Sequence, residues 1–180
     1  MAFTTHHFTA DQHFGHARML EHRPFGTTDE MDRYLIDAHN AVVKDADIVW
    51  MLGDFSAHQD SRTAQIFGQL RGRKRLILGN HDLDHSGHVR KGIAALAWDQ
   101  PPVHYAEVKQ DRERVILHHY AMRTWAASVD GSWHFYGHSH GRLSPYGRSR
   151  DCGVDCPDTG FAPMTFLALT ARMRDAEVVA

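Results

Sequence analysis

The sequence predicts an α/β fold in which strands and helices alternate along one domain covering residues 1–180. The apolar runs Ile48–Leu52 and Arg75–Leu78 lack polar alternation, as strands buried on both faces do. Between them, Thr27–Glu30 has the pattern of a capping box and precedes apolar residues at helical spacing. Five of the expected strands end at Asp, His or Asn. Because ligands bind beyond the carboxyl ends of strands in open α/β sheets, the sequence predicts one site on this rim.

The elements follow one another in a simple order. Strands are expected at 3–10, 48–52, 75–78, 103–108, 114–117 and 133–136, and further strands at 150–156 and from Met164 onward. Helices are expected at about 31–42 and 61–70, with a polar turn at Arg71–Lys74. We expect these strands to complete the sheets around a single core.

The composition and net charge argue against a membrane protein and against a nucleic-acid-binding protein. The 180 residues are 42% hydrophobic, enough for a well-formed core, and the net charge of -2 offers no general attraction to nucleic acid or anionic membranes. No apolar run reaches the length of a membrane span, and the first residues do not resemble a signal peptide. We therefore expect a cytoplasmic protein without a membrane or nucleic-acid partner. The sequence leaves its oligomeric state open.

Histidine is over-represented, with 16 residues in the chain, and it is the commonest metal ligand in proteins. If residues 11–13 are extended, Asp11 and His13 point to the same side and could bind one ion. His138-x-His140 is expected to present two imidazoles in the same way. Gly53-Asp54 is either a plain turn or a carboxylate at the rim of the site.

The segment Gly79-Asn80-His81-Asp82 is the most specific of these patterns. Asn80 offers a neutral oxygen ligand, His81 a proton donor, and Asp82 a carboxylate that could orient His81. His118 and His119 point opposite ways on a strand, so one of them is expected to be a ligand. Eight other histidines without a visible partner are expected to be packed or solvated: His6, His7, His22, His39, His85, His88, His104 and His134.

Together, Asp11-x-His13, Gly53-Asp54, Gly79-Asn80-His81-Asp82, His119 and Gly137-His138-x-His140 resemble the calcineurin-like metallophosphoesterase superfamily. The blocks occur in the family's order, and Asp11-x-His13-Phe14-Gly15-His16 is similar to a small bacterial or phage branch. The resemblance implies a two-sheet β-sandwich flanked by helices, with the active site at the carboxyl ends of the strands.

The resemblance also implies roles for the matching residues. One metal ion would be held by Asp11, His13 and His140, a second by Asn80, His119 and His138, and Asp54 would bridge them. His119 is preferred over His118 because it directly precedes Tyr120, as the family's ligand precedes Tyr or a small residue. His81 would be the catalytic histidine and Asp82 its orienting partner. His58, after Gly53-Asp54, is a further possible site residue.

The implied activity is hydrolysis of phosphodiester or phosphomonoester bonds in small, nucleotide-like substrates by a two-metal hydroxide mechanism. Mixed Asp, His and Asn ligands suit two divalent transition-metal ions, with manganese expected and iron, zinc or nickel as alternatives. Little sequence remains for a cap, so we expect an open pocket that favours diesters. His16, Arg123 and Trp125 are expected at its rim.

Two other functions fit parts of the sequence. A protein-interaction scaffold with a vestigial site should lack the bridging carboxylate or the catalytic histidine, whereas Asp54 and His81 are both present. A zinc-bound nucleic-acid module could use Cys152 and Cys156, but it would need a basic surface and a second ligand pair. Two buried thiols are the preferred interpretation of these cysteines.

Overall fold

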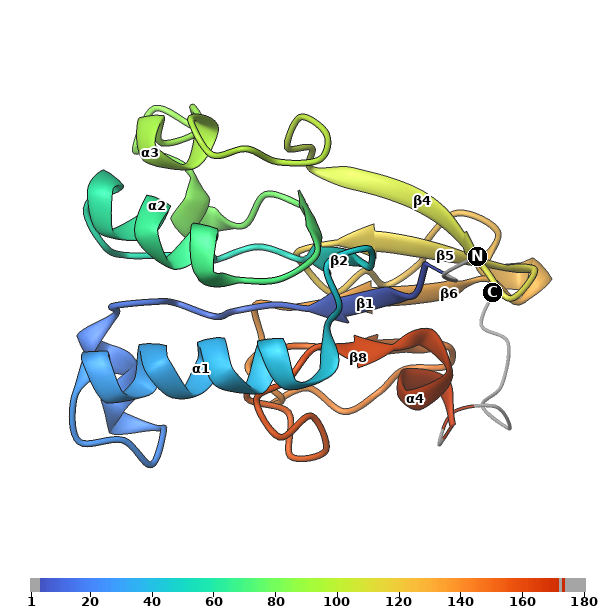
Figure 1. The fold of residues 1–180 in the computed structure, drawn as a ribbon. Coiled ribbons are helices and arrows are strands. Elements are labelled where there is room, and N and C mark those ends of the chain that lie inside the picture. The colour runs from blue at the N-terminus through green and yellow to red at the C-terminus, as the bar shows by residue number, and fades with distance from the viewer. Residues whose placement is uncertain (1–3, 172, 174–180) are drawn as a thin grey trace.

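The computed structural model describes residues 4–171 and 173, which form two four-stranded sheets with helices outside them (Figure 1). The first sheet has the order β3-β2-β1-β8 and contains β1 (His6–Thr9), β2 (Ile48–Met51), β3 (Arg73–Leu76) and β8 (Met164–Thr165). Strands β1, β2 and β3 are parallel, and β8 runs antiparallel to β1. The carboxyl ends of three strands therefore lie at one edge.

The second sheet has the order β4-β5-β6-β7. It contains β4 (Tyr105–Gln110), β5 (Glu113–His118), β6 (Trp133–Tyr136) and β7 (Ser149–Asp151). Strands β5, β6 and β7 are parallel, and β4 is antiparallel to β5. The two sheets flanked by helices confirm the expected α/β sandwich.

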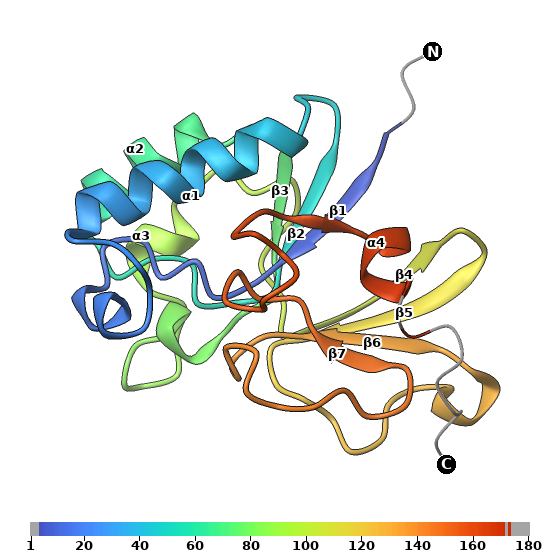
Figure 2. The same ribbon diagram turned by 90° about the horizontal axis from the view of Figure 1, so that it is seen from below.

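Helices α1 (Thr28–Val42), α2 (Asp60–Gln69) and α3 (Lys91–Ala94) lie on one side of the first sheet, and the second sheet lies on the other (Figure 2). Alternate residues of β2 show the two layers: Val49 and Met51 pack with the helices, whereas Trp50 packs between the sheets. Burial on both faces explains the continuous apolar runs in the sequence. No helix in the described ranges is long and apolar enough to cross a membrane.

Short elements complete the chain: the 3-10 helices η1 (Ala17–Glu21), η2 (Asn80–Asp82) and η3 (Ser128–Asp130), and helix α4 (Phe166–Thr170). The Thr27 hydroxyl caps α1 by accepting the Glu30 N–H. The Glu30 carboxylate, however, accepts the N–H of Gly26, one residue before the position that a capping box requires.

Three expected boundaries are wrong. Strand β3 begins at Arg73 rather than after a turn at 71–74, because the Arg73 N–H donates to the Asp47 carbonyl and pairs this segment with β2. Only residues 149–151 of the stretch near 150–156 form a strand. In the stretch from Met164, Met164–Thr165 form a strand but Phe166–Thr170 are helical, because the Thr165 hydroxyl accepts the Ala168 N–H and starts α4. The expected strand residues Phe3 and Arg172 and the segment 174–180 lie outside the described residues.

Candidate metal centre and active site

The chain turns sharply where the strands end. Asp11, His13, Asp54, His138 and His140 all have positive φ, between 50° and 66°. Residues 11–13 and 138–140 are therefore not extended, and strand alternation does not set the directions of their side chains. Left-handed backbone is unfavourable for residues other than glycine, so surrounding contacts must hold it.

The turns bring the ligand-type side chains into three overlapping groups. Their nitrogen and carboxylate oxygen atoms lie within 4.8 Å of one another in each group: Asp11, His13 and His140; His13, Asp54 and His81; Asp54, His119 and His138. Asp54 belongs to two groups and is only 2% exposed, so it lies between the two ends of the cluster. His138 and His140 fall in different groups, contrary to the expectation that their imidazoles face one side together.

His119 lies at the end of the cluster that also contains Asn80. Its Nδ1 is 2.7 Å from the Leu52 carbonyl oxygen, to which it donates, so the other nitrogen of the neutral ring carries a lone pair. That nitrogen, Nε2, lies 3.1 Å from Asn80 Oδ1, also an acceptor. Burial lowers the pKa of His119 and keeps the ring neutral. Two acceptors facing each other fit a shared cation.

His13 carries an unsatisfied nitrogen at the other end. Its Nε2 is buried, makes no hydrogen bond within the described part of the chain, and lies 3.4 Å from Asp54 Oδ2. Burial, aided by His140 and His81, lowers the pKa of His13 to about 2. A neutral imidazole cannot satisfy a carboxylate as an ion pair does, whereas a divalent cation would satisfy both.

Asp11 adds buried negative charge to this end. Its side chain is fully buried, and both oxygens accept the His138 N–H, at 3.0 and 2.9 Å. Burial together with the nearby carboxylates of Asp151 and Asp54 raises the pKa of Asp11 well above its usual value. Buried carboxylates are retained where they are paired or coordinate metals, so the donor set fits divalent ions.

A partly buried ion pair between Arg23 and Asp155 supports His140. The Asp155 carboxylate accepts from His140 Nδ1 at 2.7 Å and from Nε and Nη2 of Arg23 at 2.7 and 2.8 Å. Although burial opposes it, these bonds lower the pKa of Asp155 well below its usual range. With Nδ1 engaged, Nε2 of His140 is available as a ligand.

Asp151 holds the turn that carries His138 and His140. Its Oδ2 accepts the Ser139 hydroxyl at 2.7 Å and the Gly141 N–H at 2.9 Å, and its Oδ1 accepts the Gly153 N–H at 2.7 Å. These bonds fix the positive-φ backbone described above.

Asp82 does not orient His81 as expected. Its Oδ1 accepts the Phe55 N–H at 3.0 Å, and its Oδ2 accepts the N–H groups of Asp54 and Gly79, both at 2.9 Å. Burial raises the pKa of Asp82 to about 6 even though these bonds oppose the shift. Asp82 therefore holds the Asp54 loop against the 79–82 turn.

His81 is the exposed member of the second group. Its N–H donates to Asp54 Oδ1 at 2.8 Å, and its ring centroid is 4.9 Å from that of His13 and 5.4 Å from that of His16. The exposed His81 imidazole lies next to the Asp54 carboxylate and is available to a bound substrate.

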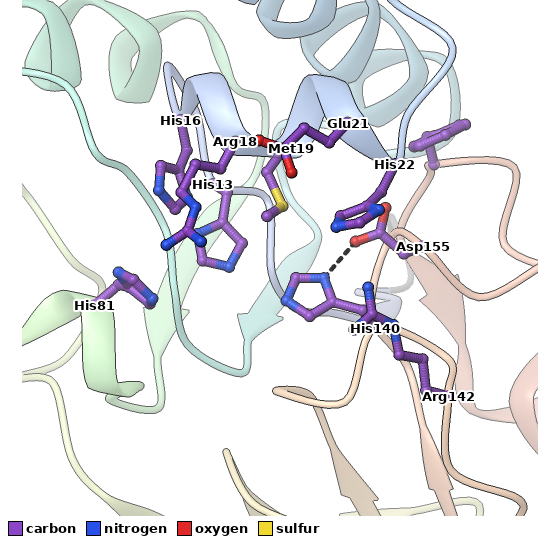
Figure 3. Close-up of a pocket in the computed structure, with 11 residues that line it drawn as sticks. His13, His16, Arg18, Met19, Glu21, His22, His81, His140, Arg142 and Asp155 are labelled. Carbon is purple, nitrogen blue, oxygen red and sulfur yellow. Dashed lines mark hydrogen bonds and ion pairs between the residues drawn. The ribbon is translucent and has the colours of Figure 1, made fainter.

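A half-open cavity of about 500 Å³ adjoins the cluster (Figure 3). Its lining includes the expected rim residue His16, together with His13, His81 and His140. Arg123 is not part of this lining, and its guanidinium lies over the Tyr146 ring, 5.1 Å from the centroid. Trp125 is buried and donates to the Ser132 carbonyl, so it packs in the interior and not at the rim.

Other histidines and both cysteines have structural positions. His58 Nε2 lies 2.5 Å from Asp32 Oδ2, and Asp32 Oδ1 accepts the Gly15 N–H at 2.8 Å, so His58 steadies the loop after His13. His118 contacts the Tyr120 backbone and belongs to none of the three groups. Cys152 and Cys156 are buried, and burial raises the pKa of both thiols, as expected of packed thiols.

Sequence reasoning missed the residues that support the ligands. Asp155 lies within the stretch 150–156 that was expected to be a strand, so it was not considered as a carboxylate beyond a strand end; the observed strand ends at Asp151. Arg23 and Asp32 carry no such signal, because one lies in a loop and the other within α1. His22, expected to be packed or solvated, lines the cavity.

Part of the chain is similar in sequence to a phage protein. No protein-family model matches the chain. The gene 66 protein of Mycobacterium phage D29 is 42% identical over 81 residues, which cover 43% of this chain and 40% of the phage protein. The chain thus spans about 40% of the length of this relative.

Two solved structures show the fold. A protein of unknown function from Aquifex aeolicus superposes with a TM-score of 0.66 at 21% identity, covering 91% of this chain and 96% of the Aquifex chain. A novel archaeal phosphodiesterase superposes with a TM-score of 0.52 at 15% identity, covering 83% and 82% of the two chains. The chain therefore shares the two-sheet α/β fold of these two structures.

Proposed function

We propose that this chain is a metal-dependent phosphoesterase that hydrolyses phosphodiester or phosphomonoester bonds in small, nucleotide-like substrates. The observation that carries the proposal is the convergence of Asp and His side chains from five strand ends on Asp54. The fold shared with an archaeal phosphodiesterase supports the same class of reaction.

The groups of side chains, with Asn80 beside His119, support the ligand sets that the resemblance implied. Asp11, His13 and His140 would hold one divalent ion, and Asn80, His119 and His138 a second, with Asp54 between them. When bound, two such ions polarise the phosphate and lower the pKa of the attacking water. Manganese is the proposed metal, because the mixed nitrogen and oxygen donors suit a transition metal of intermediate hardness.

The chain's own residues supply the remaining chemistry. His81 is exposed beside the cluster and would donate a proton to the departing oxygen. Its main-chain N–H fixes Asp54, so the ring and the central carboxylate keep a constant spacing. The cavity beside His81 has room for the organic part of a small ester. The preference for diesters over monoesters, expected from the sequence, is part of this proposal.

Turnover of two chromogenic esters tests the proposal. The purified chain, stripped with chelator and reloaded with manganese, should hydrolyse bis-p-nitrophenyl phosphate and, more slowly, p-nitrophenyl phosphate. Stripped protein should be inactive, since its residues alone cannot generate the nucleophile. Absence of turnover with manganese, iron, zinc and nickel alike would reject the proposed activity. Monoester turnover tenfold above diester turnover would reject the diester preference.

A further inference from the structure

The cavity lies on one side of the candidate metal centre. His13, His140 and His81 contribute to its lining, whereas Asn80, His119 and His138 do not. Helix η1 forms the opposite wall through Arg18, Met19 and Glu21 (Figure 3). A substrate held at the metal centre would therefore extend from the Asp11 end of the cluster toward η1.

Arg18 is a charged group without a partner in this wall. Its side chain is exposed and makes no hydrogen bond or ion pair with any described residue. Arg142, the other arginine of the lining, makes none with the described residues either, but Figure 3 shows its side chain pointing away from His13 and His81. Figure 3 shows the Arg18 guanidinium extending from η1 toward His13 and His16, with His81 across from it.

The rest of the cavity suits a hydroxylated, partly apolar group. Met19 and Phe161 give apolar surface, while Glu21 and His22 offer a hydrogen-bond acceptor and a ring nitrogen. The Asp155 carboxylate in the lining is already bound by Arg23 and His140. A volume of about 500 Å³ lies within the range of small-molecule sites. Sugar hydroxyls and a flat base match this mixture better than a purely apolar alcohol does.

We propose that Arg18 is a substrate-binding residue that contacts the phosphoryl oxygens, and that the cavity between η1 and His140 binds the nucleoside part of the ester. The assignment rests on the proposed phosphoesterase function and names the residue that selects its substrate. A guanidinium presents paired donors that match phosphate oxygens. Arg18 takes the place at the rim that the sequence had indicated for Arg123.

Ligand binding to the manganese-loaded chain tests this assignment directly. Calorimetry would compare inorganic phosphate, adenosine 5′-monophosphate and adenosine on the unmodified chain, Arg18→Ala and Arg123→Ala. Because Arg18→Ala removes a charged hydrogen bond, its affinity for phosphate and for adenosine 5′-monophosphate should fall by about ten- to a hundredfold. Adenosine binding should be unchanged, and Arg123→Ala should behave like the unmodified chain.

Each alternative result has a distinct meaning. Equal affinities in Arg18→Ala and the unmodified chain, with normal manganese content in both, would overturn the role of Arg18. Adenosine 5′-monophosphate binding no tighter than inorganic phosphate would overturn the nucleoside site. Inorganic phosphate and adenosine contain no phosphoester bond, so an unmodified chain that binds them but hydrolyses no ester would reject the proposed function instead.

Discussion

The Arg23 guanidinium joins two parts of the candidate metal centre that are far apart in the sequence. It donates to the carbonyls of Asp11 and Gln12 at 2.7 and 2.8 Å and pairs with Asp155, which in turn holds His140. It is only 4% exposed, so these bonds are shielded from water. Arg23 and Asp155 thus position two ligands of the first proposed ion without themselves being ligands.

Asp155→Asn should weaken the binding of one of the two proposed manganese ions. The amide cannot accept the His140 proton and pair with Arg23 as a carboxylate does, and loss of such a partner typically costs about 10–100-fold in metal affinity. Titration calorimetry with manganese would measure the change, with Asp37→Asn on the exposed face of α1 as the control. Unchanged affinity for both ions in a folded variant would show that Asp155 does not position His140.

At the residue scale, the sequence predicted the ligands better than their supports. Asp11, Asp54, Asn80 and His119 follow apolar strands, and that position marks them. The hydrogen-bond partners of Asp82 could not be predicted, because the three N–H groups that donate to its carboxylate come together only in the folded loops. Likewise, positive φ at His138 and His140 depends on bonds from Asp151 and has no local sequence signal.

At the scale of single elements, α1 and β6 each bury a neutral histidine. His39 Nε2 on α1 donates to the Arg71 carbonyl at 2.9 Å, and His134 on β6 lies between the Ile116 carbonyl and the Met122 N–H. Burial lowers the pKa of each histidine to about 4, against an ordinary value of 6.5. Both histidines therefore remain uncharged in the folded chain at neutral pH.

The free energy of unfolding should fall as the pH drops from about 6.5 to about 4. In that range the unfolded chain binds protons at these histidines and the folded chain does not, whereas above it both states are neutral. Each histidine accounts for a loss of a few kcal/mol, on the order of 1.4 kcal/mol per pH unit. Urea unfolding of metal-free protein at several pH values would measure the slope.

His39→Gln isolates one of these contributions. The variant should show a shallower pH dependence than the unmodified chain, while His88→Gln, at an exposed position, should not. Identical slopes for all three proteins would show that His39 already binds a proton in the folded state.

Element boundaries show where sequence patterns lose information. The helix at 28–42 was well predicted, because its cap and its apolar spacing are local features. The start of β3 was not, because Arg73 joins the sheet only through the partner strand. Residues 166–170 were misjudged because Phe166 and Leu169 pack into the core between the sheets on one face of α4. A short apolar run with this spacing cannot be distinguished from a strand.

At the scale of the whole molecule, the two sheets place strand ends from both halves of the chain around one carboxylate. Loops after β1 and β2 supply Asp11, His13 and Asp54, and loops after β5 and β6 supply His119 and His138. Parallel strands explain why the residues within each half converge. The meeting of the halves follows from the packing of Phe8, Trp50 and Phe135 between the sheets. The motif order indicated this convergence, while the cavity and its η1 wall depend on the complete fold.

Metal content of Asp54→Asn is the most direct test of this account. Elemental analysis after manganese loading and desalting should give two ions per chain for the unmodified protein. Asp54→Asn should retain one ion or none and lose bis-p-nitrophenyl phosphate turnover by several orders of magnitude, with its circular dichroism unchanged. The amide keeps the size of the side chain but removes the charge between the two ligand groups. A folded Asp54→Asn that keeps two ions and full turnover would contradict the account.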